Sequence, residues 1–450
     1  MLYRVHREFR ASKHLFGRIR HVYVNPQRVN EDFGALHHPT YITNLVDSGI
    51  VQAFLIRGGG RMLKTFTILY GILAGLASAG LAMIRRRPSV PDDDLPTVAV
   101  IVAARNEERN LPNLIGALAA QEYPESKVSF LIVDDDSEDA TWRIARSAEQ
   151  RDSRFHALRT DPLSTIASPK KRALDTGIRA CDAEWIVTTD ADCQPGPGWL
   201  RSLASSMRET VGVVLGYAPL TGVKNPVQVL AAGESWSAAV LCAAAVGAGY
   251  PFNAFGRNFA YRRQLYLDLG GYGSGSTMAS GDDDLFLQRI TARTDWKAAF
   301  SADPRSYVPS SVPPASKLVS TKARHLSVGP KYAPGWVVIG SVASALFMGL
   351  GLATIAALLG LVKPATVWTA WKRKWLFDLI MASSALRVIG DPARAGMAMA
   401  TASSAPFLLW AIWPKALFGN VQWKGRTFVR GRAGMPIEDE VYNPEMSTTE

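Results

Sequence analysis

Cysteine is scarce in this chain of 450 residues, which contains only Cys181, Cys193 and Cys242. Three cysteines cannot all pair within one chain, and their spacing matches neither a C-x-x-C motif nor a zinc site. This usage is typical of a protein that folds in a reducing compartment, and it excludes a disulfide framework.

Nucleic-acid-binding motifs are also lacking, although the formal net charge is +11. The sequence has no helix-turn-helix or zinc-finger spacing, and its basic residues cluster beside apolar segments. Attraction to anionic lipid headgroups therefore accounts for the positive charge better than nucleic acid does. We expect membrane lipids, and no nucleic acid, among the partners.

Charge is missing from two long stretches and limited to Lys415 in a third, and 48% of the whole chain is hydrophobic. Residues 65–84, 336–362 and 395–419 are predicted as transmembrane helices, because about 20 apolar residues cross a bilayer. Residues 371–389 combine tryptophans and cations with an apolar stripe, which indicates an interfacial helix or a short membrane helix. The sequence thus leaves three or four crossings open.

The segments before the first and after the last predicted membrane helix are interpreted separately. Residues 1–61 form a basic segment, and a native start at Met62 is a second hypothesis for it, since Met62-Leu63-Lys64 before an apolar run is a normal signal-anchor beginning. Residues 420–450 are expected to form a tail on the same side of the membrane as the soluble block, residues 96–331. Arg85, Arg86 and Arg87 place that side in the cytoplasm by the positive-inside rule, although Arg57, Arg61 and Lys64 weaken the signal.

The soluble block alternates between strand and helix patterns. Residues 97–104, 128–133 and 185–189 are apolar runs too continuous for a one-sided sheet, and helical spacing follows the first two. Strand, helix, strand, helix, strand implies right-handed crossovers. The predicted fold is α/β, a Rossmann-like and mostly parallel sheet flanked by helices.

Acidic and polar residues follow each of these strands. They are Arg105-Asn106-Glu107, Asp134-Asp135-Asp136 and Asp190-Ala191-Asp192. Ligands bind at the carboxyl ends of the strands in such sheets. Asp190 and Asp192 would share one face if their strand continued, and Mg²⁺ or Mn²⁺ takes one or two carboxylates and leaves its other positions to water and phosphates.

With these clusters in order, the chain resembles the family 2 glycosyltransferases of the GT-A fold. Further segments carry the resemblance: Lys171-Arg172-Ala173-Leu174, Phe255-Gly256-Arg257-Asn258, Gly270-Gly271-Tyr272 and Ser280-Gly281-Asp282-Asp283-Asp284-Leu285. The resemblance spans about residues 97–324. It implies a nucleotide-sugar donor, with UDP as the expected nucleotide, and a divalent metal, Mg²⁺ or Mn²⁺.

The resemblance also implies roles for single residues. Asp134, with Asp135 beside it, would accept the imide N–H of uracil. Ala103, Arg105, Asn106 and Glu107 would line the nucleoside. Lys171 would lie near the diphosphate, whereas Lys170 and Arg172 are interpreted as solvated charges. Asp192 would bind the metal, and Asp190 would hold either the metal or the ribose.

An inverting transferase needs a base for the acceptor hydroxyl, and the carboxylates before Leu285 can supply one. Counting back from Leu285 selects Asp282, whereas matching the Glu-Asp pair common in the family selects Asp283. Both therefore stay candidates. Asp284 is better explained as a carboxylate at a helix amino terminus.

The chain departs from the processive members of the family. Where they carry Gln-x-x-Arg-Trp, this chain has Thr321-Lys322-Ala323-Arg324-His325, which keeps only the arginine. Arg324 is expected to meet the diphosphate. The difference favours transfer of a single sugar to a lipid-soluble or other membrane-borne acceptor by an integral protein of the bacterial inner membrane. The alternatives are a polyprenyl-phosphate sugar synthase, a processive polysaccharide synthase and, in another class, a nucleotidyltransferase.

Overall fold

The computed structural model describes residues 49–161, 164–273, 278, 280–419, 421–423, 426–428 and 436–437. The predicted basic segment up to residue 48, and most of the predicted tail after residue 419, lie outside the described residues. Residues 49–61, which the sequence analysis assigned to the basic segment, belong to a helix that continues to Met83.

A mixed sheet of seven strands forms the centre of the sheet domain, residues 98–300, and it confirms the predicted α/β fold. Its strands are β1 (Val98–Ala104), β2 (Val128–Asp134), β3 (Phe155–Arg159), β4 (Trp185–Asp190), β5 (Val211–Leu215), β7 (Phe259–Arg262) and β8 (Lys297–Phe300). They lie in the order β3-β2-β1-β4-β7-β5-β8, and only β7 runs antiparallel to its neighbours. Two short strands, β6 (Leu220–Thr221) and β9 (Ser310–Ser311), pair separately.

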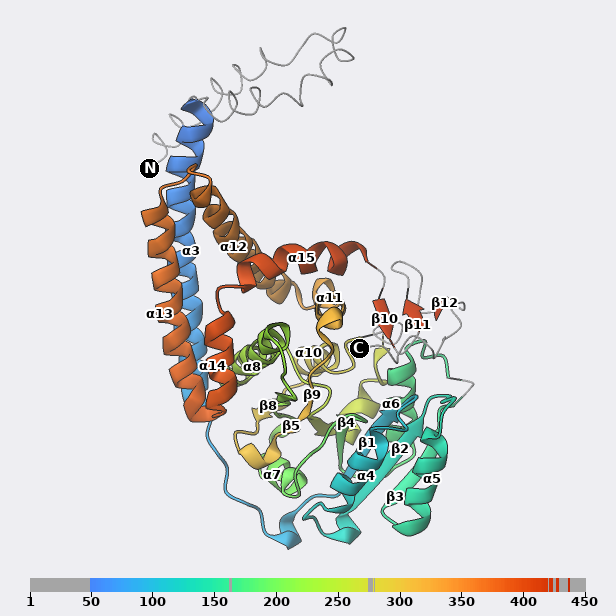
Figure 1. Ribbon diagram of the computed structural model, residues 1–450. Coiled ribbons are helices and arrows are strands. Elements are labelled where there is room, and N and C mark those ends of the chain that lie inside the picture. Colours follow the sequence, from blue (N-terminus) through green and yellow to red (C-terminus); the bar gives the residue numbers. More distant parts are fainter. Residues whose placement is uncertain are drawn as a thin grey trace.

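Helices cover both faces of this sheet (Figure 1). On one face lie α4 (Leu111–Ala119), α5 (Thr141–Arg151) and α7 (Trp199–Ala204), packed against strand residues such as Val98, Val100 and Val102. On the other lie α6 (Pro169–Arg179), α8 (Pro226–Gly247), α9 (Arg263–Asp268) and α10 (Asp284–Arg293), packed against residues such as Ala99 and Ile101. Alternate residues of β1 thus face opposite cores, as the near-continuous apolar run predicts for a strand buried on both sides.

The remaining helices gather at one side of the sheet domain. They are α3 (Gly49–Met83), α11 (Leu318–Leu326), α12 (Pro334–Leu358), α13 (Pro364–Val388), α14 (Pro392–Thr401) and α15 (Ala405–Phe418). Figure 1 shows α3 and α13 side by side, extending away from the sheet. A cluster around Leu63, Phe66, Leu350 and Trp371 joins α3, α12 and α13.

By length and composition, three of the described helices could cross a membrane: Gly60–Met83, Pro226–Gly247 and Pro334–Leu358. The first and third correspond to predicted spans. The second, α8, is 67% buried inside the protein because it packs between the sheet and the helices that precede and follow the sheet in the chain. Residues 395–419, predicted as one helix, form α14 and α15 with a bend of 82° between them, which makes a broken span or a re-entrant loop.

Two glycines let α3 pack closely on α8, and this contact connects the candidate span to the sheet domain. A Cβ on Gly80 would collide with the carbonyl of Ala244, and a Cβ on Gly247 would collide with the carbonyl of Gly80. Small residues allow two helix backbones to approach in this way. The core of the sheet domain and the helix bundle therefore form one packed unit at this crossing.

A buried ion pair lies inside the helix bundle. Lys374 and Asp378 sit one turn apart on α13, with Nζ 2.7 Å from Oδ2 and side chains only 3% and 8% exposed. Lys374 also donates to the carbonyl of Ala402 at 3.0 Å, at the break between α14 and α15. The Tyr70 hydroxyl of α3 donates to Asp378. Four helices therefore meet at this pair.

We expect Asp378→Ala to destabilise the protein by about 3–5 kcal/mol, because it leaves the Lys374 ammonium buried without its counter-charge. The double variant Lys374→Met/Asp378→Leu should recover most of that loss, since apolar replacements of similar volume remove both charges. Unfolding of the detergent-solubilised protein measures both effects. Equal destabilisation by the single and double variants would contradict the ion-pair explanation.

Candidate functional site

The polar clusters predicted at the strand ends lie together. Strands β2, β1 and β4 are neighbours, with Ala104 beside Asp134 and Ala103 beside Asp190 in register. Because all three strands are parallel, their carboxyl ends share one edge of the sheet.

The chain turns at the end of β4 instead of continuing as a strand. The Cys193 N–H donates to the carbonyl of Asp190 at 3.1 Å, and Cys193 pairs with Ser310 in an isolated bridge. Asp192 therefore sits within a turn, and strand alternation does not set its direction relative to Asp190. The next residue continues this path, since Gln194 N–H donates to the carbonyl of Pro309 at 2.9 Å.

Lys170 lies at the centre of the site, in the first turn of α6. Its Nζ is 3.0 Å from Asp190 Oδ1 and 2.9 Å from Asp282 Oδ2, and its side chain is 18% exposed. Burial alone would raise the pKa of Asp282, but the charge and hydrogen bond of Lys170 outweigh burial and hold that pKa below its ordinary value. Asp282 is therefore ionised at neutral pH.

These contacts show that Lys170 is not the solvated charge of the sequence interpretation. The place of Lys171 near the diphosphate stays a prediction. The Lys171 side chain is fully buried, and it donates to the carbonyls of Met278 at 3.0 Å and Ser280 at 2.7 Å. Burial lowers the pKa of Lys171 to about 8. Adjacent residues of a helix point about 100° apart, so the two neighbouring lysines have different hydrogen-bond and ion-pair partners.

Asp283 is committed to backbone contacts. Its Oδ2 accepts from the Gly256 N–H at 2.7 Å, and its Oδ1 accepts from the Asp284 N–H at 2.8 Å, at the start of α10. A Cβ on Gly256 would lie 3.1 Å from the carboxylates of both Asp282 and Asp283, so glycine allows this close approach. The hydrogen bonds of Asp283 fix the loop on which Asp282 is presented.

Asp284 points the other way, toward the helix bundle. It accepts a hydrogen bond from the Tyr332 hydroxyl, just before α12. Burial and the neighbouring Asp283 raise the pKa of Asp284 well above its ordinary value. The Ala333 N–H also donates to Gln288 Oε1 at 2.8 Å, so the start of α12 is fastened to α10.

Asp134 and Asp135 are both buried but differ in their partners. Asp135 is held by Arg172 at 2.6 Å and by Arg105 at 3.8 Å, which shows that Arg172 is not simply solvated. Asp134 is 2% exposed, and its Oδ1 has no hydrogen-bond partner among the described residues. A buried carboxylate oxygen without a donor costs free energy unless a ligand supplies one.

Asn106 and Glu107 join the loops after β1 and β2. Asn106 adopts φ +52°, and its Oδ1 accepts from the Glu138 N–H at 2.9 Å. The Glu107 N–H donates to Thr141 Oγ1 at 2.7 Å. In the structure these predicted nucleoside contacts hold two loops of the site together.

Arg324 reaches the site from α11. Its Nη1 is 3.5 Å from Ser280 Oγ, two residues from Asp282. Its Nη2 is 3.1 Å from His325 Nε2. The arginine that the sequence retains thus lies beside the loop that Lys171 supports.

Two predicted metal ligands, the carboxylates of Asp190 and Asp192, lie at the end of β4. Within the described ranges, no group of three or more His, Cys, Asp or Glu side chains is arranged to hold a metal ion. Asp190 is partly exposed, at 34%, and Asp192 is half-buried at the same strand end. Two carboxylates fit Mg²⁺ or Mn²⁺, which takes its remaining ligands from water and substrate phosphates.

Comparison with known proteins gives a consistent result. The model of the family described as glycosyl transferase family 2 matches residues 99–272. Glycosyltransferase AglE of Haloferax volcanii is 32% identical over 116 residues, which cover 26% of this chain and 37% of the relative. Beta-monoglucosyldiacylglycerol synthase of Trichormus variabilis is 29% identical over 174 residues, which cover 38% of this chain and 36% of the relative.

The chain therefore spans well under half the length of these two relatives. Among solved structures, the mannosyltransferase PcManGT from Pyrobaculum calidifontis, in complex with GDP-Man and Mn²⁺, aligns with a TM-score of 0.52 and 20% identity. The alignment covers 80% of this chain and 98% of that one, so the shared fold extends beyond the sheet domain.

Proposed function

Because residues 99–272 belong to glycosyl transferase family 2, we propose that this protein transfers a sugar from a nucleotide-sugar donor to the hydroxyl of a membrane-borne acceptor. The observation that carries the proposal is the position of Lys170. One ammonium group bridges Asp190, at the strand end where the diphosphate would bind, and Asp282, the candidate base. Donor and acceptor chemistry would thus meet within one ion-paired cluster.

Asp134 supports a uracil nucleotide as the donor base. Its buried Oδ1 has no donor among the residues that the structure describes, and the imide N–H of uracil would satisfy it. Arg172 and Arg105 occupy Asp135 instead. We assign base recognition to Asp134 and the placement of the loop to Asp135.

Asp190 and Asp192 would hold a divalent ion. The structure of PcManGT, which shares the fold, is a complex with GDP-Man and Mn²⁺. A bound ion would neutralise charge on the departing nucleoside diphosphate. Lys170 and Arg324 would add positive charge at the same edge, Arg324 from beside Ser280. A carboxylate pair with two cations around it suits an anionic leaving group.

Asp282 is the base that we propose for an inverting, single-sugar transfer. Lys170 keeps its carboxylate ionised, so it can accept the proton of the acceptor hydroxyl. Asp283 has both of its oxygens engaged by backbone N–H groups, and Asp284 is hydrogen-bonded to Tyr332. Of the three aspartates, Asp282 is the one on the side of Asp190.

The start of α12 supports an acceptor held at the membrane surface. This candidate span begins at Pro334, directly after the residues that contact Asp284 and Gln288. Phe252 also stacks on Trp336, with ring centroids 4.2 Å apart. The acceptor hydroxyl would therefore reach Asp282 from the surface at which α12 enters the bilayer, and Arg85–Arg87 favour the cytosolic side of the inner membrane.

The test is an assay of the full-length protein in phospholipid vesicles with a UDP-sugar, Mn²⁺ and a lipid extract. We expect release of UDP together with a lipid that has gained one sugar. Release of pyrophosphate would instead identify a nucleotidyltransferase. A sugar attached to a lipid phosphate would instead identify a polyprenyl-phosphate sugar synthase. A long polysaccharide would identify a processive synthase.

A further inference from the structure

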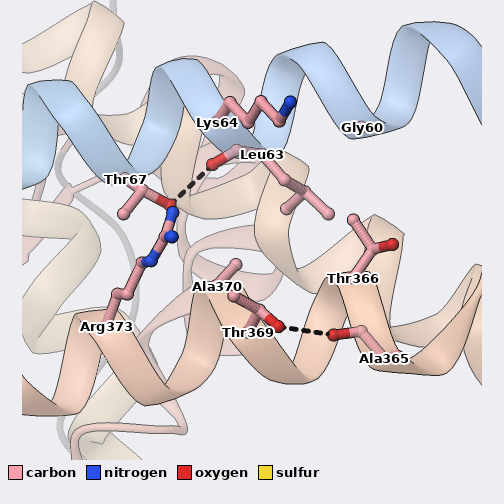
Figure 2. Close-up of a pocket in the computed structure, with 9 residues that line it drawn as sticks. All are labelled: Gly60, Leu63, Lys64, Thr67, Ala365, Thr366, Thr369, Ala370 and Arg373. Carbon is pink, nitrogen blue, oxygen red and sulfur yellow. Dashed lines mark hydrogen bonds between the residues drawn. The ribbon is translucent and has the colours of Figure 1, made fainter.

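A pocket of about 330 Å³ lies between α3 and α13, outside the catalytic site. Residues that line it include Gly60, Lys64 and Thr67 of α3 and Thr366, Thr369 and Arg373 of α13. Figure 2 shows Arg373 extending from α13 toward Thr67 on α3. Ligand pockets in proteins have volumes of roughly 300–1,000 Å³, so a small polar group fits here.

The charge of this pocket is entirely positive. Lys64 and Arg373 line it together, and no acidic residue does. Both cations are exposed, and in the part of the chain that the structure describes neither makes an ion pair. Hydroxyl groups supplement them, although Thr67 and Thr369 donate their own protons to the carbonyls of Leu63 and Ala365. The pocket therefore offers two cationic side chains as hydrogen-bond donors, whereas the hydroxyls of Thr67 and Thr369 already donate to backbone carbonyls.

The surroundings of the pocket are apolar. Beyond it, α3 exposes Ile68 and Ile72, at 63% and 53%, and α13 exposes Leu376 and Leu379, at 54% and 55%. Trp368, 53% exposed, lies beside the pocket residues on α13. Tryptophan and cations at the end of an apolar helix surface are typical of a membrane interface.

The pocket also lies at a defined place in the bundle. It is at the amino-terminal end of the candidate span Gly60–Met83, whereas Gly80 and Leu81 near the other end pack on the sheet domain. Most of the length of the candidate span Gly60–Met83 thus separates the pocket from the sheet domain, which carries Asp190 and Asp282.

We propose that this pocket binds the phosphate of an anionic phospholipid, with Arg373 and Lys64 as its charged contacts and the acyl chains along the exposed faces of α3 and α13. The pairing of a cationic pocket with a continuing apolar surface matches the two parts of a phospholipid. Basic pockets between membrane helices bind acidic headgroups in this way. The proposal does not depend on the catalytic mechanism.

Native mass spectrometry of the full-length protein from nanodiscs tests the proposal, using phosphatidylcholine with and without phosphatidylglycerol. We expect retained phosphatidylglycerol on the wild type and about 30-fold weaker binding for Lys64→Ala/Arg373→Ala, the equivalent of about 1 kcal/mol for each cation. Lys372→Ala is the matched control, because Lys372 is exposed on the same helix and does not line the pocket. It should bind like the wild type.

Three outcomes would overturn the proposal. They are unchanged binding in the double variant, an equal loss in Lys372→Ala, and displacement of the lipid by millimolar inorganic phosphate, which would identify a free-anion site. The conservative variant Lys64→Arg/Arg373→Lys should keep most of the binding. It preserves both charges and guards against a folding defect in the alanine variant.

Discussion

Asp282→Asn should lower kcat for sugar transfer by about 10²–10⁴-fold, the range for loss of a general base. Asparagine keeps the shape of the side chain but cannot take the proton of the acceptor hydroxyl. Donor affinity should change little, because the nucleotide would bind at Asp134 and Asp190, on the other side of Lys170. Release of nucleoside diphosphate measures kcat, and calorimetric titration with the donor measures affinity.

Asp283→Ala provides the contrast. It removes the carboxylate that caps α10 and accepts the Gly256 N–H, so a stability loss of about 1 kcal/mol is expected from the cap alone. The melting temperature should fall while transfer by the folded fraction persists. A loss of kcat in Asp283→Asn as large as that in Asp282→Asn, at unchanged melting temperature, would transfer the base assignment to Asp283.

Much of the fold could be predicted because strands buried on both faces have a simple pattern. Val98, Val100 and Val102 face one core while Ala99 and Ile101 face the other, and this requires an uninterrupted apolar run. The parallel direction of β1, β2 and β4 followed from the alternation of strands and helices, whereas their order in the sheet was not predicted. The antiparallel strand β7 was not predicted, because its pairing depends on contacts distant in sequence.

The site was predicted less completely, because the partners of a charged side chain depend on how distant elements pack and not on the local sequence pattern. The sequence analysis interpreted Lys170 as a solvated charge, and only the placement of α6 against β4 and α10 shows that it forms ion pairs with Asp190 and Asp282. Likewise, the tryptophans and cations of residues 371–389 suggested an interfacial helix, and the segment also contains Lys374 and Asp378. In the structure they form a buried pair that Tyr70 and Ala402 complete from other helices.

Asp192→Ala should reduce turnover by about 10³-fold, because a charge pair at about 4 Å contributes on the order of 4 kcal/mol at an effective dielectric of 20. Asp182→Ala is the matched control, since Asp182 is a fully exposed acidic side chain just before the amino-terminal end of β4, opposite the candidate site. Electron paramagnetic resonance of Mn²⁺ with UDP reports binding directly. Binding of Mn²⁺ by Asp192→Ala at wild-type affinity, or full wild-type turnover in EDTA, would contradict the metal role.

Comparison with Asp190→Ala separates the metal from the ion pair. Both substitutions remove a proposed metal ligand, but Asp190→Ala also releases Lys170, whose Nζ lies 3.0 Å from Asp190 Oδ1. Lys170 would then pair with Asp282 alone and hold that carboxylate more tightly. Excess Mn²⁺ should therefore rescue part of the turnover of Asp192→Ala but less of that of Asp190→Ala. Equal rescue of the two variants would mean that Lys170 does not connect the donor carboxylate to the base.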